Sequence, residues 1–87
     1  MITPDPDVVI GKFFSRYNGG VVPDLEADMF AAGVLTSLVA MQLVRLIEQR
    51  WMFELPVSEL RRDNFRSIGS IRTLIERNVH AGPAPAV

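Results

Sequence analysis

The fold of this chain is decided by the stretch G-V-L-T-S-L-V-A-M-Q-L-V-R-L-I-E-Q-R-W, which runs from Gly33 to Trp51. Thr36 and Ser37 are residue types that cap helices, because a side-chain oxygen can accept a hydrogen bond from an unpaired amide of the first turn. Apolar residues then recur at the spacing of a helix with one buried side. The stretch predicts a helix from Thr36 or Ser37 to about Arg50 or Trp51. Its inward stripe is expected to comprise Leu43, Val44, Ile47 and Trp51, with Leu46 near the edge.

The other side of this helix is expected to face solvent. It is predicted to bear Val39, Gln42, Arg45 and Gln49, with Glu48 as its only acidic residue. Leu38 and Met41 lie at the front of the helix, on a flank of the inward stripe. Two interpretations of Leu38 and Met41 stay open: they pack wholly into the core, or they remain on the surface as contacts for another protein.

A first helix is predicted over residues 5–17. Asp5 supplies an acid at the cap and Pro6 occupies the first turn, where its missing amide hydrogen costs nothing. The sequence Asn18-Gly19-Gly20 is expected to end this helix, because these residues tolerate a positive φ. The buried stripe of the helix is expected to contain Val9, Ile10, Phe13, Phe14 and Tyr17.

The connection between these two helices, residues 21–36, is long for so small a domain, and such connections are often functional. We predict an ordered loop that Leu25, Met29 and Phe30 pin to the core, with one short helical turn over residues 25–30. The sequence after Trp51 predicts an extended link over residues 53–56.

A short helix is then expected, capped by Ser58, anchored by Phe65 and ending by about residues 63–64. Ser67 or Ser70 is expected to cap the last helix, whose apolar residues are Ile68, Ile71, Leu74, Ile75 and Val79. The predicted fold class is all-α, a small four-helix bundle of three main helices and one short helix, with a long first loop. Residues 1–80 would form the domain and residues 81–87 a flexible tail.

Composition excludes several functions for this chain of 87 residues. It contains no cysteine, so disulfides, thiolate metal sites and cysteine nucleophiles are impossible. Its single histidine, His80, lies beside the tail, and no metal site is expected. A net charge of −1 argues against binding nucleic acid through phosphate contacts. The N-terminus does not look like a signal peptide and no apolar run is long enough to span a membrane, so we expect a cytoplasmic protein that binds no membrane.

The order of these elements resembles the acyl carrier proteins and peptidyl carrier proteins. In that family a long loop leads to Gly-x-Asp-Ser-Leu, and the serine starts the second helix. The resemblance covers about residues 8–79 and is strongest across A-A-G-V-L-T-S-L-V-A-M-Q-L-V-R-L-I-E. The segments S-L-V-A-M-Q-L-V and D-N-F-R-S-I look most like the discrete, free-standing carriers of polyketide pathways.

The resemblance implies that the hydroxyl of Ser37 accepts 4′-phosphopantetheine from coenzyme A, transferred by a phosphopantetheinyl transferase. The thiol of this arm would hold an acyl or aminoacyl group as a thioester, so the protein itself would catalyse nothing. The implied partners are an acyltransferase or adenylating loading enzyme and polyketide synthase or tailoring enzymes, with the carrier acting as a monomer. A modified malonyl extender unit is our first expectation for the cargo, and an aminoacyl or β-aminoacyl starter is the second.

Three departures from the family pattern bear on partners. Thr36 stands where the family usually has an aspartate that is thought to help orient the metal and the transferase. Gly33 lies four residues before Ser37 rather than the usual three. The second helix also lacks the acidic surface common in carriers, so we expect docking to depend on Thr36, Leu38, Met41 and Arg45, with Arg45 meeting an acid on the partner.

Alternative functions come from other classes of protein. Ser37 could be only a helix cap, in which case the chain would be an unmodified helical adaptor between proteins. The run R-R-D-N-F-R-S-I-G-S-I-R before the last helix could belong to a DNA-binding helix-turn-helix, although Ile68 and Ile71 look buried. An enzymatic activity of its own is disfavoured, because no acid–base pair or activated nucleophile stands out, and no catalytic residue is predicted.

Overall fold

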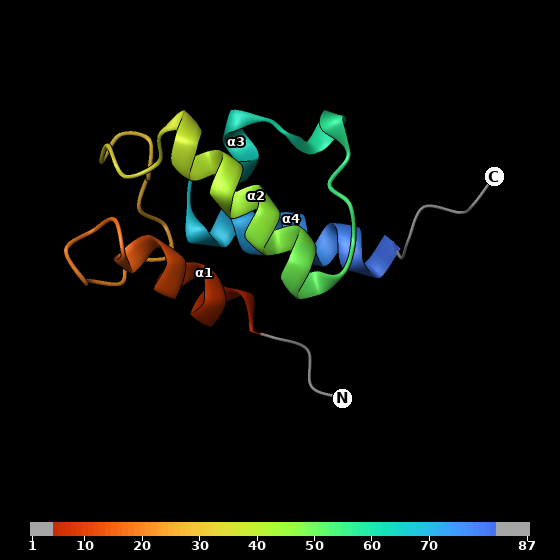
Figure 1. Ribbon diagram of the computed structural model, residues 1–87, viewed down its shortest axis with the longest axis horizontal. Coiled ribbons are helices and arrows are strands. Elements are labelled where there is room, and N and C mark those ends of the chain that lie inside the picture. Colours follow the sequence, from red (N-terminus) through yellow and green to blue (C-terminus); the bar gives the residue numbers. More distant parts are fainter. Residues whose placement is uncertain (1–4, 82–87) are drawn as a thin grey trace.

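The computed structural model describes residues 5–81, and the side chains of residues 5–79 (Figure 1). The elements are α1 (Pro6–Ser15), α2 (Ser37–Trp51), a 3₁₀ turn η1 (Val57–Glu59), α3 (Arg62–Phe65) and α4 (Ile68–Ala81). Within this range there is no strand, and the predicted bundle of three main helices and one short helix is confirmed. Residue 81, which we assigned to the tail, is the last residue of α4, whereas residues 82–87 lie outside the described range.

Helix α1 begins as predicted but ends two residues early. The Asp5 carboxylate accepts a hydrogen bond of 3.0 Å from the Asp7 amide, and Pro6 occupies the first helical position. At the other end the amide of Tyr17 donates to the Phe14 carbonyl at 2.9 Å, a tighter turn than an α-helix makes. Tyr17 therefore lies beyond the helix and is 41% exposed, instead of buried in the stripe as predicted.

The long loop is held mainly through its backbone. The Met29 amide donates to the Arg66 carbonyl at 2.7 Å, and the Gly69 amide donates to the Leu25 carbonyl at 2.9 Å. Met29 is buried as predicted, but Leu25 is 41% exposed and does not pin the loop. The expected helical turn over residues 25–30 does not form; a single turn begins at Asp28 instead, where the Ala32 amide donates to the Asp28 carbonyl at 3.0 Å and the Asp28 carboxylate accepts from the Phe30 and Ala31 amides.

The core lies among α1, α2 and α4, with α1 and α3 packing mainly on α4 (Figure 1). Its buried apolar residues are Ile10, Phe13, Phe14, Met29, Val34, Leu35, Val39, Leu43, Ile47, Trp51, Leu55, Phe65, Ile68, Ile71, Leu74 and Ile75. The prediction for Val39 was wrong: we expected this side chain to face solvent, but it is buried, with 6% of its surface exposed. It lies four residues before Leu43, so it extends the buried stripe by one turn. Val44 and Leu46 are only partly buried.

The segment between α2 and α4 is built differently from the prediction. Ser58 caps no helix, because it lies within η1, and α3 begins separately at Arg62 with no side-chain cap. Phe65 is buried and anchors α3 as predicted. Of the two proposed caps for α4, Ser67 is confirmed: its hydroxyl accepts a hydrogen bond of 3.1 Å from the Ser70 amide.

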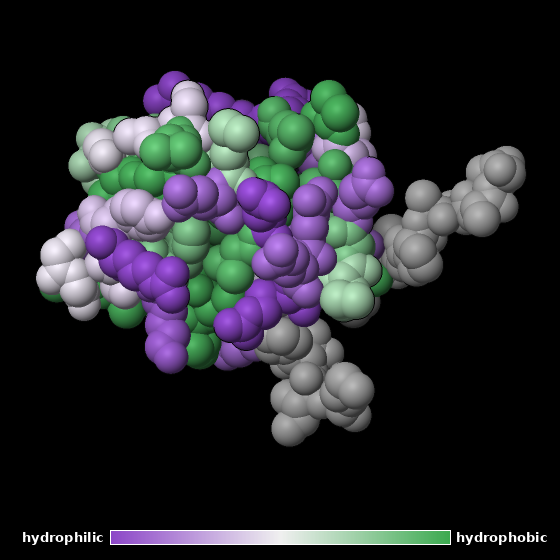
Figure 2. Space-filling view, in the orientation of Figure 1, coloured by the Kyte–Doolittle hydropathy of each residue, from purple (hydrophilic) through white to green (hydrophobic). Residues whose placement is uncertain are grey.

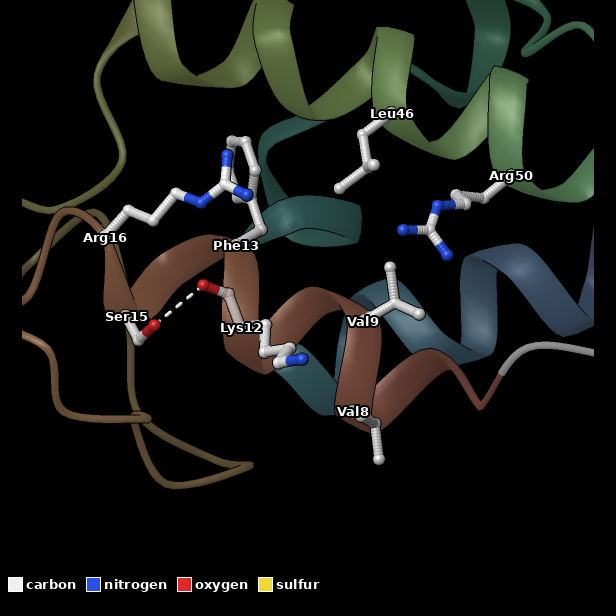
Figure 3. Close-up of a pocket in the computed structure, with 8 residues that line it drawn as sticks. All are labelled: Val8, Val9, Lys12, Phe13, Ser15, Arg16, Leu46 and Arg50. Carbon is white, nitrogen blue, oxygen red and sulfur yellow. Dashed lines mark hydrogen bonds between the residues drawn. The ribbon is translucent and has the colours of Figure 1, made fainter.

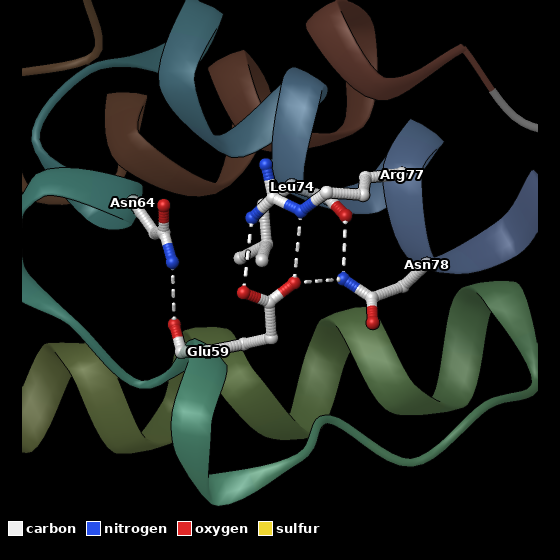
Figure 4. Close-up of polar contacts among 5 residues, drawn as sticks. All are labelled: Glu59, Asn64, Leu74, Arg77 and Asn78. Carbon is white, nitrogen blue, oxygen red and sulfur yellow. Dashed lines mark hydrogen bonds and ion pairs between the residues drawn. The ribbon is translucent and has the colours of Figure 1, made fainter. Parts of the chain in front are cut away.

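Glu59 at the end of η1 ties this segment to α4 (Figure 4). Its carboxylate accepts two hydrogen bonds of 3.0 Å from the Arg77 guanidinium and one of 2.8 Å from the Asn78 amide. The backbone carbonyl of Glu59 also accepts a bond of 2.8 Å from the Asn64 side chain. The bonds from Arg77, followed by that from Asn78, lower the pKa of Glu59 below its ordinary value.

Candidate functional site

Ser37 is the first residue of α2, and its side chain is exposed. Thr36, the residue before it, caps the helix: its hydroxyl oxygen accepts from the Val39 amide at 3.3 Å and its carbonyl from the Ala40 amide at 2.8 Å. The Ser37 hydroxyl has no hydrogen-bond partner among the described residues. The question left open by the sequence, whether Thr36 or Ser37 is the cap, is therefore answered in favour of Thr36.

The chain that leads to Ser37 is held in place. Gly33 has a φ of +75°, a conformation that glycine adopts without strain. The amides of the next two residues, Val34 and Leu35, both donate to the Met29 carbonyl, at 3.1 and 3.0 Å, and both side chains are buried. The backbone is thus fixed up to the residue before Thr36.

The start of α2 suits an anionic group attached to Ser37. The amides of Ser37 and Leu38 donate to no partner in the described part of the chain, because Thr36 accepts only from the next two amides, those of Val39 and Ala40. Unpaired amides at the N-terminus of a 15-residue helix favour a phosphate, through both hydrogen bonding and the helix dipole. No acidic residue lies in the first turn to oppose it. A phosphodiester therefore fits these residues.

The surface beside Ser37 is apolar and carries no acid on α2. Leu38 and Met41 are 66% and 68% exposed, so the interpretation that they pack wholly into the core is wrong. Arg45 is exposed, as predicted. Glu48, the only acid of the helix, accepts a hydrogen bond of 2.9 Å from the Leu55 amide and is partly buried.

A shallow apolar hollow of about 260 Å³ adjoins Met41, and the sequence did not reveal it. The Arg62 guanidinium lies 4.3 Å from the centre of the Phe30 ring, which forms part of its wall. Its lining comes from three separate segments of the chain: Phe30, Ala40, Met41, Val44, Leu60, Arg61, Arg62 and Phe65. The sequence shows the adjacent basic pair Arg61-Arg62. That pair alone does not predict that Arg62 packs against Phe30, which lies 32 residues earlier in the chain.

Three observations bear on DNA binding, metal binding and membrane insertion. Ile68 and Ile71 are fully buried, as predicted, so they cannot face DNA as a recognition helix would require. No group of three or more His, Cys, Asp or Glu residues suited to a metal occurs within the described residues, although the His80 side chain lies outside them. None of the described helices is long and apolar enough to cross a membrane.

The structure thus presents an exposed serine at the start of a main helix, beside free amides and an apolar surface, and an anionic group attached to this serine would fit there. Comparison with known proteins agrees. Residues 18–76 match the family described as "Phosphopantetheine attachment site". The D-alanyl carrier proteins of Streptococcus pyogenes strains Manfredo, NZ131 and MGAS8232 are each 31% identical over 75 residues, which cover 86% of this chain and 95% of theirs.

This chain belongs to the phosphopantetheine-attachment family, which comprises the acyl and peptidyl carrier proteins. Its cofactor is a covalently attached 4′-phosphopantetheine. The resemblance noted in the sequence is thereby confirmed at the level of the family and the fold.

Proposed function

We propose that Ser37 bears the 4′-phosphopantetheine arm. The observation that carries this proposal is the division of roles between two adjacent hydroxyls: Thr36 caps α2 and Ser37 is left exposed without a partner. A serine that the helix does not need can be esterified without loss of a native bond. The free amides beside it can stabilise the resulting phosphodiester.

When bound, the arm supplies a distal thiol that holds an acyl or aminoacyl group as a thioester. The chain's own residues hold the attachment point rigidly and offer a surface to partner enzymes, and we assign it no catalytic step. The proposed setting is polyketide biosynthesis in the cytoplasm. The partners there are a phosphopantetheinyl transferase, an acyltransferase or adenylating loading enzyme, and polyketide synthase or tailoring enzymes. The sequence segments quoted above, S-L-V-A-M-Q-L-V and D-N-F-R-S-I, support this setting.

A second candidate concerns the cargo. The streptococcal relatives are named for a D-alanyl group, which favours an aminoacyl cargo loaded by an adenylating enzyme over a malonyl-type extender unit. The two candidates share the attachment residue and the arm, and they differ in the group carried and in the enzyme that loads it onto the thiol.

The attachment is tested by intact mass after incubation with coenzyme A, Mg²⁺ and a promiscuous phosphopantetheinyl transferase. We expect an increment of the size of phosphopantetheine in the native chain and none in Ser37→Ala. Ser58→Ala, which removes another exposed hydroxyl, is the matched control and should retain the increment. If several transferases give no increment with a folded native chain, the unmodified helical adaptor is the better description.

The cargo is tested with the modified protein and two loading systems. One contains a malonyl-type coenzyme A thioester with an acyltransferase, and the other contains D-alanine and ATP with an adenylating enzyme. Loading by the first system alone supports the extender unit, and loading by the second alone supports the aminoacyl cargo. Neither outcome bears on whether Ser37 is modified, which the mass of the unloaded protein reports separately.

We propose that partners dock on Leu38, Met41 and Arg45, with Thr36 at the edge. The exposure of both apolar side chains one turn apart supports this, as does the lack of a free acid on this side of α2. Arg45→Glu should slow modification or loading by partners with an acidic surface and leave the fold intact. Unchanged kinetics with every partner would contradict the role of Arg45.

A further inference from the structure

A second surface hollow lies between α1 and α2, away from the attachment end. It measures about 450 Å³ (Figure 3). Its lining is formed by Val8, Val9, Lys12, Phe13, Ser15 and Arg16 from the α1 segment and by Leu46 and Arg50 from α2. From Val8 to Arg16 it follows α1 for about 12 Å at the rise of an α-helix. We call this hollow the α1–α2 groove.

The α1–α2 groove combines an apolar floor with cationic walls. Figure 3 shows Arg16 and Arg50 extending over the groove from opposite ends, with Phe13 and Leu46 between them. Lys12 lies along the α1 side. Figure 2 shows the same alternation on this face, where hydrophobic atoms lie between hydrophilic ones over α1 and α2.

The three cations of the groove lack a counter-charge. None of Lys12, Arg16 and Arg50 forms an ion pair with an acid in the described part of the chain, in contrast to Arg72 and Arg77. No acidic residue lines the groove. Lys12 and Arg16 are also four residues apart on one helix, where like charges repel each other. An anionic occupant would relieve this repulsion and cover the apolar floor at the same time.

The groove is separate from the attachment end of α2. The Tyr17 hydroxyl hydrogen-bonds to Gln42, and this bond joins the segment just after α1 to α2 between the groove and Ser37. Leu46 lies nine residues after Ser37, or about 13 Å along the helix axis. An occupant of the groove can therefore bind while the serine and the Leu38–Met41 surface stay accessible to another protein.

We propose that the α1–α2 groove docks an acidic amphipathic segment of a partner protein, which places apolar side chains on Phe13 and Leu46 and carboxylates on the surrounding cations. Charge complementarity selects this occupant: an uncharged apolar segment would leave the three cations unpaired, and a basic one would be repelled. The groove would hold the carrier near one partner while a second enzyme acts at the other end of α2.

The probe is a synthetic amphipathic peptide that carries leucine and glutamate on one helical face, with a lysine-for-glutamate counterpart as the control peptide. Binding is followed by amide chemical shifts of the isotopically labelled, unmodified protein. We expect shifts at Val9, Phe13 and Leu46, an affinity that falls as salt is added, and no binding of the lysine peptide.

Two double variants with the same change in charge locate the site. The double variant Arg16→Glu with Arg50→Glu should bind the glutamate peptide with about tenfold lower affinity, because the complementary charges are lost. Arg61→Glu with Arg66→Glu removes two exposed cations elsewhere and should change the affinity by less than about twofold. Circular dichroism confirms that both variants remain folded.

Three results would overturn the proposal. If the two double variants lose the same affinity for the glutamate peptide, the peptide responds to the overall charge of the protein and does not bind a defined site. Shifts confined to Leu38 and Met41 would place the peptide on the other surface of α2. Binding to phosphatidylglycerol vesicles without binding to the peptide would assign the groove to a lipid surface.

Discussion

Replacement of Thr36 by valine removes the oxygen that accepts the Val39 amide and keeps a β-branched side chain of similar size. Thr36 is the N-cap of α2, whereas the Ser37 hydroxyl has no partner in the described structure. The companion variant Ser37→Ala deletes a hydroxyl of the same kind one residue later. The pair therefore tests the division of roles on which the proposed attachment at Ser37 depends.

Loss of an N-cap threonine costs about 1 kcal/mol. The Thr36–Val39 bond of 3.3 Å is slightly long, which argues against the upper end of the measured range. For a domain of this size, about 1 kcal/mol lowers the melting temperature by about 4–8 °C. Ser37→Ala breaks no bond, so its stability should stay within about 0.5 kcal/mol of the native chain.

The assay is thermal and urea unfolding of the unmodified proteins, followed by circular dichroism at 222 nm, where α-helix dominates the signal. The urea m-value should be the same in all three chains, because the surface exposed on unfolding does not change. If Ser37→Ala costs as much as Thr36→Val, or if Thr36→Val costs nothing, Thr36 is not the cap and the argument for a free serine fails.

Three further predictions concern the frame of the domain. Because Arg77 lowers the pKa of Glu59, the contribution of Glu59 to stability is complete above the ordinary glutamate value of 4.5 and is lost as the pH falls through the lowered value. Glu59→Gln should lower the free energy of unfolding by about 1 kcal/mol at neutral pH and flatten the dependence of that free energy on pH, as measured by urea unfolding at a series of pH values. An unchanged dependence on pH would contradict the role of Glu59. Leu43→Ala should lower the free energy of unfolding by about 2–5 kcal/mol in the same assay, because Leu43 is fully buried. Met41→Ala on the same helix should lower it little, because Met41 is exposed. Gly69→Ala should lower the melting temperature, because its new Cβ would lie 3.3 Å from the Leu25 carbonyl oxygen; an unchanged temperature would mean that the loop moves freely.

Local chemistry explains which parts of the fold could be predicted from sequence. The caps at Asp5 and Thr36 act within three residues of the amides that they bind, so the chain itself contains the whole signal. Val39 was placed on the wrong side although a signal existed, since it precedes Leu43 by one four-residue step. Ser58 resembled a cap just as well, but the geometry there depends on Glu59 and its partners on α4, which lie far along the chain.

The candidate site divides in the same way. The sequence predicted Ser37 as the candidate site and placed Leu38 and Met41 beside it, because all three lie within the first turns of one helix. Whether Leu38 and Met41 are buried or exposed was left open, and the structure shows both exposed. It could not reveal the hollow beside Met41, whose lining comes from three segments, or the α1–α2 groove, whose walls belong to two helices. Sites assembled from distant segments depend on packing, which periodicity along the chain does not report.

The loop between α1 and α2 is attached to the rest of the domain by the carbonyl of Leu25 and the amide of Met29. Every residue type except proline offers both groups, so these two bonds by themselves make no demand on side-chain type. Two other loop positions do constrain the sequence: the Asp28 carboxylate accepts hydrogen bonds from the amides of Phe30 and Ala31, and Gly33 has a φ of +75°. A further constraint falls on Gly69, where any larger residue would press on the Leu25 carbonyl and the Glu26 carboxylate. New recognition residues can therefore be grafted at exposed positions of this loop, provided that Asp28, Gly33 and Gly69 are kept.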